Sequence, residues 1–454
     1  MSAPAVESEH RTGLTPAERL KASLLFTWFF TSITTLWLLK PIRTASLLVH
    51  LGAEELPYLR FGSVAGVGLV VLAYSRVVNR FTRLDVVRGS ALIFAAVLAL
   101  FWASLRIGGA ALGAERWFVW AVFIMVDIYS TVMVAIFWTY ANDVVSRTEA
   151  DKLYGPIGIG GILGGVAGGV AVDVLVRSIG PVDMLLLCVA LVLLGGALGW
   201  LTESVLKPPP RVVVVKRKAA LEDALEGARE VLRSRYLLWL VAIVVAYEFA
   251  AAVTDFVINV VFERAFHSEV EIARMYGRLG WIVSAVALAC QFVLVPALLP
   301  LKRVALIVPP IAMLVATVGL ALVPTVPLAI IMAASDRGLN YSLQQVTKET
   351  LYVPLTDAQR YKAKALIDMF VDRAAKALSS VGLLAVIASV GVSIGASLAL
   401  AIASLVVWAF AANALGRAYH AHVGKERDDQ APAPPPAKAA AGVIEPSSSP
   451  DPVR

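Results

Sequence analysis

The stretch WFVWAVFIMVDIYSTVMVAIFWTYA, residues 117–141, decides the fold, because a single charge, Asp127, interrupts it. A bilayer core about 30 Å thick needs roughly 20 apolar residues per spanning helix. Comparable runs recur along almost the whole chain of 454 residues, of which 59% are hydrophobic and 16% charged. With a mean hydropathy of +0.76, the chain holds more apolar side chains than one soluble core could hide. The sequence therefore predicts a polytopic α-helical membrane protein.

The all-α fold is predicted to have twelve transmembrane helices in two halves of six, as in major-facilitator-type carriers. The predicted spans are residues 22–39, 58–77, 87–105, 117–141, 155–177, 181–202, 236–261, 275–299, 304–324, 327–352, 363–389 and 391–417. The first should be retained as a membrane helix, because polar residues precede it and no small-residue cleavage site follows. Cys188 and Cys290 fall inside spans, so neither a disulfide framework nor a metal cluster is indicated.

Five segments follow from this pattern: an N-terminal tail 1–20, a first half 21–203, a linker 204–235, a second half 236–420 and a tail 421–454. The linker contains Leu221, Leu225, Ala228 and Leu232 at helical spacing, which predicts an amphipathic surface helix. The C-terminal tail is rich in Pro, Ala and Ser and lacks periodicity, so we expect it to be disordered.

The distribution of Lys and Arg between alternate loops predicts the orientation. One set of loops is rich in them: Arg76, Arg80, Arg83, Arg88, Lys302, Arg303, Arg360, Lys362 and Lys364. The opposite set is poorer, with Arg106, Arg116 and Arg177. Both termini are therefore predicted to be cytoplasmic, most simply in a bacterial inner membrane. This bias and contact with anionic lipid explain the net charge of +7, so no nucleic-acid partner is indicated.

Charged side chains lie inside spans that should exclude them. A charge at mid-bilayer costs about 2.5–3.5 kcal/mol on insertion scales, so such residues usually face a water-filled path or the bundle interior. They form stripes at helical spacing in three spans: Glu248, Asp255 and Asn259 in the seventh; Asp336, Asn340, Gln344 and Lys348 in the tenth, beside Arg337; and Lys364, Asp368, Asp372 and Lys376 in the eleventh, beside Arg373. Helices of this kind are stable if their polar faces line an aqueous cavity or one another.

The first span ends in Lys40 and Arg43, and the fourth contains Asp127. Cations suit a multiply anionic substrate, because Arg and Lys form charge-assisted hydrogen bonds to phosphate or carboxylate oxygens. Acids can hold those cations in the empty site or carry a coupling proton. The alternative for each charge is an interhelical ion pair or a position nearer the membrane interface.

Six glycines of the fifth span predict close helix packing: Gly160, Gly161, Gly164, Gly165, Gly168 and Gly169. They are not interpreted as a phosphate loop, because no Gly-Lys-Ser/Thr element follows. No catalytic arrangement or cofactor motif is recognisable, so the sequence does not indicate an enzyme.

Two blocks resemble a known family. Residues 137–161, FWTYANDVVSRTEADKLYGPIGIGG, and residues 348–376, KETLYVPLTDAQRYKAKALIDMFVDRAAK, are similar to signatures of the ATP:ADP antiporter family of plastids and intracellular bacteria. The resemblance implies a twelve-helix carrier that exchanges ATP against ADP with phosphate. It implies functional roles for Lys40, Arg43, Asp127, Asp255, Lys348, Lys364 and Lys376.

The resulting hypothesis is a nucleotide-exchanging secondary transporter that works by alternating access and is expected to be a monomer. The candidate substrate-binding residues are Lys40, Arg43, Asp127, Asp255, Arg337, Lys348, Lys364, Arg373 and Lys376. The candidate coupling or ion-pair residues are Glu248, Asp368 and Asp372. A base could stack on Trp138, Tyr140 or Tyr341, although interface anchoring or core packing is the commoner role of such aromatics.

Three departures from the family pattern keep alternatives open. Asp127 lies one position out of register with the Phe137-Trp138 pair, Asn259 replaces an expected basic residue, and alanines surround Lys376 where the family favours glycine. A proton-coupled carrier of another organic anion would have a similar sequence. So would a membrane scaffold or sensor that recruits partners through its basic linker and tail, although a scaffold would gain nothing from intramembrane charge.

Overall fold

The computed structural model describes residues 14–78, 80–207, 228–229, 231–352, 355, 363–364, 366–367 and 371–429, and this part of the chain is helical with short connections. The first half contains α1 (Pro16–His50), a short 3-10 helix (Ala53–Glu55), α2 (Leu56–Val78), α3 (Arg83–Gly113), α4 (Arg116–Val144), α5 (Arg147–Ile179) and α6 (Met184–Leu206). The second half contains α8 (Arg235–Ala265), α9 (Glu269–Leu298), α10 (Lys302–Leu322), α11 (Val326–Ala333), α12 (Gln345–Leu351), α14 (Asp372–Val390) and α15 (Ile394–Asp429).

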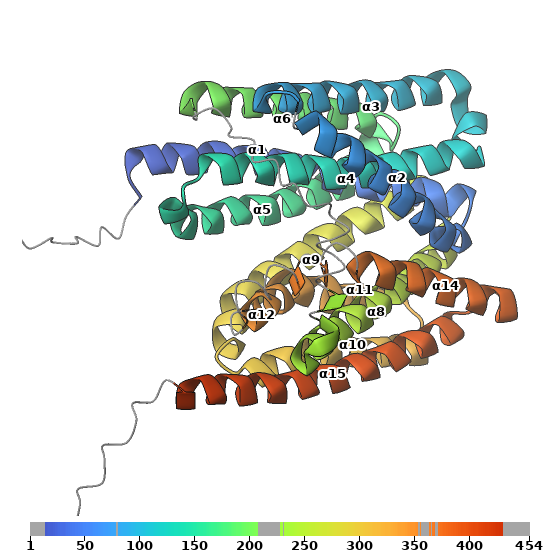
Figure 1. The fold of residues 1–454 in the computed structure, drawn as a ribbon. Helices are drawn as coiled ribbons and strands as arrows, with labels where there is room; N and C mark the ends of the chain where they lie inside the picture. Colours follow the sequence, from blue (N-terminus) through green and yellow to red (C-terminus); the bar gives the residue numbers. More distant parts are fainter. Residues whose placement is uncertain are drawn as a thin grey trace, which may run out of the picture.

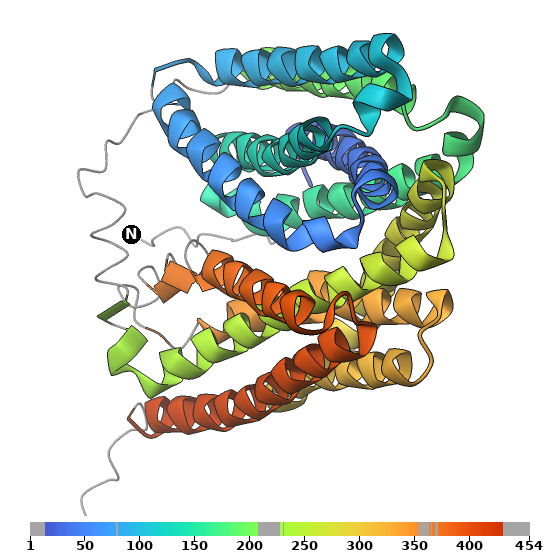
Figure 2. The ribbon, with the colours of Figure 1, turned by 90° about the vertical axis from the view of Figure 1, so that its right-hand side faces the viewer.

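The two sets of helices form two layers (Figure 1), with α1–α6 in one and α8–α15 in the other. A view turned by 90° shows the same separation, with α9 reaching up to the first layer (Figure 2). The helices within each layer are long and run back and forth, as expected for successive membrane spans. The seam between the layers is where a substrate path can lie.

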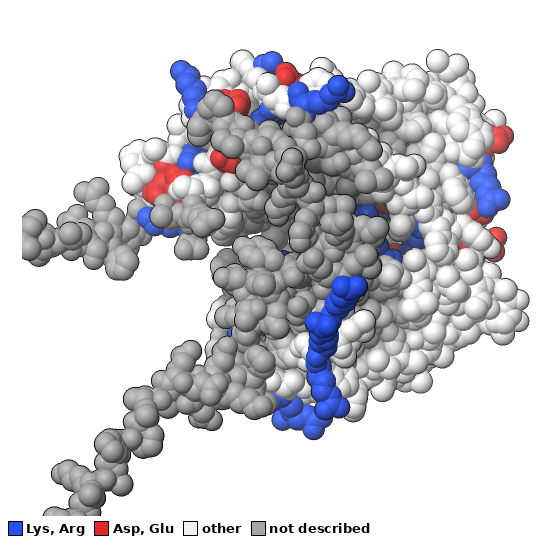
Figure 3. Space-filling model, in the orientation of Figure 1, with Lys and Arg blue, Asp and Glu red and all other residues white. Residues whose placement is uncertain are grey.

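Ten helices among the described residues are long and apolar enough to cross a membrane. They confirm the integral, multi-pass character, and Figure 3 shows broad uncharged areas over both layers. The predicted second and tenth spans, in α2 and in α11–α12, are not among the ten. The count of twelve therefore stays a prediction.

Residues 326–351 do not form one continuous α-helix, because α11 has only 8 residues and α12 only 7. Two π-helical segments, Ala334–Gly338 and Asn340–Gln344, lie between α11 and α12. A π-turn bonds residue i to i+5 instead of i+4, so it changes which side chains share a face. The stripe predicted from a regular four-residue spacing is therefore broken here.

Three helices of the first half begin with reciprocal caps. In each, a Ser or Thr side chain accepts a hydrogen bond from the backbone three residues later, and an acid at that position bonds back to the cap. The pairs are Thr15 with Glu18, Thr82 with Asp85 and Ser146 with Glu149. Glu149 also binds Lys21 at 2.9 Å, so the start of α5 is held against α1.

The glycine face of α5 packs closely on two helices, which confirms its interpretation as a helix contact. A Cβ atom at Gly164 would lie 2.6 Å from the backbone oxygen of Phe30 in α1. At Gly169 it would lie 2.6 Å from the backbone nitrogen of Trp281 in α9. Because α1 belongs to the first half and α9 to the second, α5 is packed against both.

Replacing Gly164 with Ala should destabilise the folded carrier by about 1–3 kcal/mol, since α1 and α5 would have to separate. Thermal unfolding of the purified protein, read as a lower Tm, measures the effect. The matched control is Gly158→Ala on the same helix, where a Cβ atom meets nothing within 4 Å. Equal Tm values for the two variants would contradict this account of the α1–α5 contact.

Other expectations have mixed outcomes. Cys188 and Cys290 are free and buried, as predicted. The helix α15 continues to Asp429, beyond the predicted start of the tail at 421. Residues 430–454, most of the linker including Leu221 and Leu225, and Asp368 lie outside the described residues, so the predictions made for them stay predictions.

Candidate functional site

A cavity of about 650 Å³ lies between the two halves. Helices α1, α2 and α4 line it from the first half, and α8, α9, α14 and the π-helical segments line it from the second. Its basic residues are Lys40, Arg43, Arg60, Arg337, Arg373 and Lys376, and its acidic residues are Asp127, Glu248, Asp255, Asp336 and Asp372. The predicted mixture of both charge signs is thus present in one enclosed space.

Arg43 and Asp127 form an ion pair between α1 and α4. Arg43 also donates to the backbone oxygen of Phe123 at 3.2 Å, and its guanidinium lies 4.0 Å from the centre of the Phe123 ring. Ser63 of α2 donates to the other oxygen of Asp127 at 2.6 Å. The pair is therefore held in a fixed place on the cavity wall of the first half.

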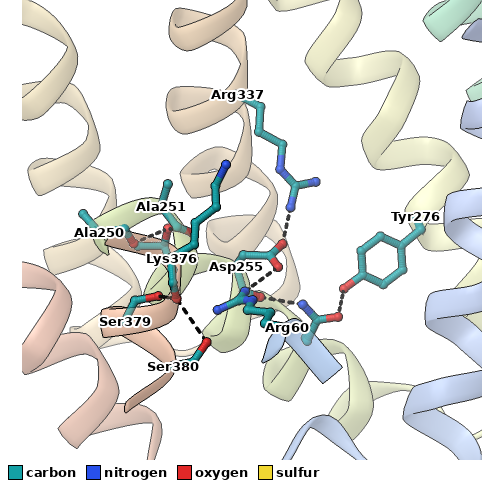
Figure 4. Close-up of polar contacts among 11 residues, drawn as sticks. Arg60, Ala250, Ala251, Asp255, Tyr276, Arg337, Lys376, Ser379 and Ser380 are labelled. Atoms are coloured by element: carbon teal, nitrogen blue, oxygen red, sulfur yellow. Dashed lines mark hydrogen bonds and ion pairs between the residues drawn. The ribbon is translucent and has the colours of Figure 1, made fainter. Parts of the chain in front are cut away.

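Asp255 of α8 joins the two halves. Arg60 of α2 donates to its Oδ2 at 3.0 Å, and Arg337 donates to its Oδ1 (Figure 4). The amide of Asn259 donates to the Asp255 backbone oxygen and accepts a hydrogen bond from Tyr276, both at 2.6 Å. Asn259, which departs from the family pattern, thus braces this stretch of α8 instead of adding a positive charge.

Lys376 of α14 bridges two acids. Its Nζ lies 2.9 Å from Asp372 and 3.3 Å from Glu248 of α8. The Lys376 side chain is still 46% exposed, so this charge can be reached from the cavity. The structure thus brings together the predicted acid Glu248 of α8 and the predicted cation of α14.

Lys40 is a cavity cation that has no ion-pair partner among the described residues. Its Nζ lies 5.6 Å from the centre of the Trp37 ring, a cation–π contact. No ion pair joins Lys40 to another described residue. Its charge is therefore available to an anion in the cavity.

Two predicted lysines lie elsewhere. Lys348 lines a separate, much smaller cavity with Gln344. Lys364 pairs with Glu349 at 2.6 Å and approaches the Tyr352 ring. Neither is among the described residues that line the central cavity, so their roles in binding stay predictions.

The three aromatic candidates for base stacking differ in position. Trp138 packs against Phe29 and Tyr154, and Tyr140 is buried against Trp28. Both therefore have core-packing roles. Tyr341 lines the cavity and is 50% exposed, so its ring face can be reached by a ligand.

A second group of polar contacts between the halves was not predicted. Asp173 of α5 accepts hydrogen bonds from Arg274 at 2.9 Å, Arg278 at 3.3 Å and Trp281 at 3.4 Å, all on α9. The sequence signal was weak, because Arg274 and Arg278 were expected near the start of a span. The contact is built where α5 and α9 cross at their glycines.

The end of the bundle where α1 and α5 finish is closed by such contacts. His50, the last residue of α1, bonds Glu269 at 2.8 Å, and Glu263 of α8 accepts from the backbone of Ala53 at 2.9 Å. At the opposite end, the polar contacts that join two described residues stay within one half: Lys21 with Glu149, Arg83 with Asp143, Arg303 with Asn413 and Lys364 with Glu349. Among the described residues, the polar contacts between the halves therefore lie at the first of these ends and, through Asp255 and Arg60, at the cavity.

Two layers of long apolar helices around a charged cavity define a secondary transporter of the major-facilitator type. Solved structures have this fold: the POT family transporter PepTSo is 12% identical, with a TM-score of 0.62 over 90% of this chain and 99% of that chain. A bacterial homologue of the iron transporter ferroportin, in an inward-facing state, is 15% identical, with a TM-score of 0.60 over 89% and 99%.

The family model described as TLC ATP/ADP transporter matches residues 103–326 and 278–419, more than half of the chain. The chain belongs to this family, which is a family of transporters and not of enzymes. A relative from Chlamydia trachomatis, "ADP,ATP carrier protein 2", is 24% identical over 88% of this chain and 88% of its own length. The resemblance found in the two sequence blocks is thereby confirmed.

Proposed function

We propose that this protein exchanges nucleotides of the ATP/ADP type across a membrane by alternating access. The observation that carries the proposal is the cavity between the halves of a TLC-family chain, lined by six basic side chains. Polyphosphates are multiply anionic, and Arg and Lys bind their oxygens through charge-assisted hydrogen bonds. The name of the Chlamydia relative supports the same substrate class.

In this proposal Lys40 and Arg43 of the first half and Arg337 of the second hold phosphate oxygens, and Arg373 and Lys376 of the second half support them. Asp127 and Asp255 hold the arginines in place while the cavity is empty. Glu248 and Asp372 do the same for Lys376. Each acid therefore keeps a cation of the cavity paired, which limits the cost of the empty state.

The orientation is also a proposal. If both termini are cytoplasmic, as the loop charges predict, α1 and α5 end at the outer face of a bacterial inner membrane. The contacts of Asp173 and His50 then close the outer end, and the cavity communicates with the cytoplasm. The structure would correspond to an inward-facing carrier.

The test is uptake of radiolabelled ATP into proteoliposomes that are preloaded with ADP or left empty. We expect uptake that requires internal ADP and falls at least about tenfold in Lys40→Gln, because hydrogen bonds to charged groups contribute about 1.5–3 kcal/mol. Lys152→Gln is the matched control, since Lys152 is 48% exposed and remote from the cavity lining. Folded, inserted protein that takes up no ATP under either condition would exclude nucleotide exchange.

One observation favours a proton-coupled carrier as the second candidate. Asp336 lines the cavity, is 6% exposed, and its Oδ1 has no hydrogen-bond partner among the described residues. A buried carboxylate in a membrane often serves proton transfer. This candidate predicts uptake into empty liposomes that is driven by a pH gradient and lost in Asp336→Asn.

A further inference from the structure

Asp255 occupies a position between guanidinium groups that belong to opposite halves. Arg60 extends from α2 and Arg337 from the π-helical segment after α11, and each donates to a different oxygen of the one carboxylate (Figure 4). Two guanidiniums on two oxygens of one anion is also an arrangement by which arginines bind a phosphoryl group. The carboxylate therefore fills a place that suits a phosphate.

Arg60 has hydrogen-bonding capacity left over. Its Nη1 is buried and has no partner among the described residues, although the side chain lines the cavity. A guanidinium carries five N–H donors, and buried donors are normally satisfied. Asp255 uses only part of this capacity, so a ligand with more oxygens would satisfy Arg60 better.

The same place can be reached by a ligand. The Asp255 side chain is 32% exposed and lines the cavity together with both arginines. A terminal phosphoryl group has three oxygens and more negative charge than one carboxylate. It can therefore compete with Asp255 for the two guanidiniums.

We infer that Arg60 and Arg337 form a phosphate clamp across the two halves, and that Asp255 occupies this clamp in the empty carrier. The inference rests on the proposed function for its ligand class and adds Arg60 as a substrate-binding residue. Because the arginines are carried by different halves, the clamp exists only while the halves are close at this level. Occupancy of the clamp is thus tied to the conformation of the carrier.

A purely structural salt bridge and a phosphate clamp predict different changes in polyphosphate affinity when Arg60 or Asp255 is replaced by an uncharged residue. In Arg60→Gln, a donor to the phosphoryl group is lost, so binding of polyphosphate should weaken. In Asp255→Asn, the competing carboxylate is lost and both guanidiniums keep their charge, so binding should tighten. If the three residues served only to hold the fold, both variants would weaken binding in the same direction.

The experiment is calorimetric titration of the purified full-length protein with inorganic tripolyphosphate, which lacks a base and a sugar. We expect Arg60→Gln to weaken binding about tenfold to a hundredfold and Asp255→Asn to tighten it several-fold. Arg60→Lys should recover only part of the loss, because an ammonium cannot reproduce the planar fork of a guanidinium. Arg106→Gln is the control, since Arg106 is 55% exposed and pairs with Asp183 away from the cavity lining.

Wild-type affinity in folded Arg60→Gln would overturn the clamp, and so would equal weakening in Asp255→Asn. The Tm of each variant shows whether it is folded. Failure of the clamp can be told from failure of the proposed function. If ATP exchange is unaffected by Arg60→Gln, the clamp is excluded and the proposed function stands. If tripolyphosphate binding depends on Arg60 but the protein does not exchange ATP, the nucleotide substrate is excluded and the clamp stands.

Discussion

Replacing Arg43 with Gln is expected to reduce nucleotide exchange by at least about a hundredfold. Removing one partner of a buried ion pair typically costs 3–5 kcal/mol, because the other charge is left unpaired. The Arg43 side chain is only 12% exposed, and Asp127 would keep just its hydrogen bond from Ser63. The variant also loses one of the cations proposed to hold phosphate, so binding and positioning fail together. The initial rate of ATP uptake into ADP-loaded proteoliposomes measures the effect.

Further variants separate the two roles of Arg43, which are pairing with Asp127 and binding phosphate. If Asp127 acts only by positioning Arg43, the double variant Arg43→Gln, Asp127→Asn will be no slower than Arg43→Gln alone. Arg43→Lys keeps the charge but loses the planar guanidinium, which can bind a phosphate through two N–H groups at once, so its exchange rate should be intermediate. Arg116→Gln is the matched control, because Arg116 is 62% exposed and pairs with Glu55. Near-normal exchange in folded Arg43→Gln would exclude Arg43 from the substrate path.

Hydropathy and charge periodicity were sufficient for much of this architecture. Apolar runs of bilayer length predicted the helices, because each spanning helix must bury its backbone polar groups internally. Charges placed where lipid excludes them marked the cavity side of several helices. Arg43, Asp127, Asp255, Arg337 and Lys376 all line the same cavity. The pairing of Arg43 with Asp127 also matches one of the predicted roles for these acids.

The sequence could not show which neighbouring helix each stripe of charged residues faces. Arg60 was available as a charge near the start of the predicted second span, but only its distance from Asp255 indicates a role. The four-residue stripe of the tenth span suggested that Asp336 and Lys348 point the same way. Two π-helical segments break that register, so Lys348 lies at a different cavity.

The contact of Asp173 with α9 shows the same limit. Its partners lie about a hundred positions further along the chain, and no local pattern links them. The glycines of α5 predicted close packing but named no neighbouring helix. That the same face also meets α9 depends on how the two halves come together, which periodicity within one helix does not encode.

The contacts of Asp173 predict the second large effect, which concerns the conformation of the carrier. Replacing Asp173 with Ala leaves Arg274 and Arg278 close together without their shared acid. Hydrogen bonds to charged groups contribute about 1.5–3 kcal/mol, so the closed outer end should lose roughly tenfold to a hundredfold in relative population. Exchange should slow, because a carrier that rarely closes outside rarely opens inside.

Labelling of a cysteine in the cavity measures this population directly. Val64 lines the cavity and is 38% exposed, so Val64→Cys in a background without Cys188 and Cys290 provides the probe. A membrane-impermeant maleimide added from outside should label it much faster when Asp173 is also replaced.

Asp183→Asn is the control for that labelling experiment. Asp183 also accepts hydrogen bonds from a Trp and an Arg, here Trp102 and Arg106, and these hold the pKa of its carboxyl below the ordinary value. Both partners belong to the same half as Asp183. Both variants therefore remove the charge of an acid at this end of the bundle. Only Asp173→Ala also removes a contact between the two halves. Faster outside labelling in Asp173→Ala but not in Asp183→Asn would identify the α5–α9 contact as the outer closure. Equal labelling in all three proteins would mean that the glycine crossing closes this end without help from Asp173.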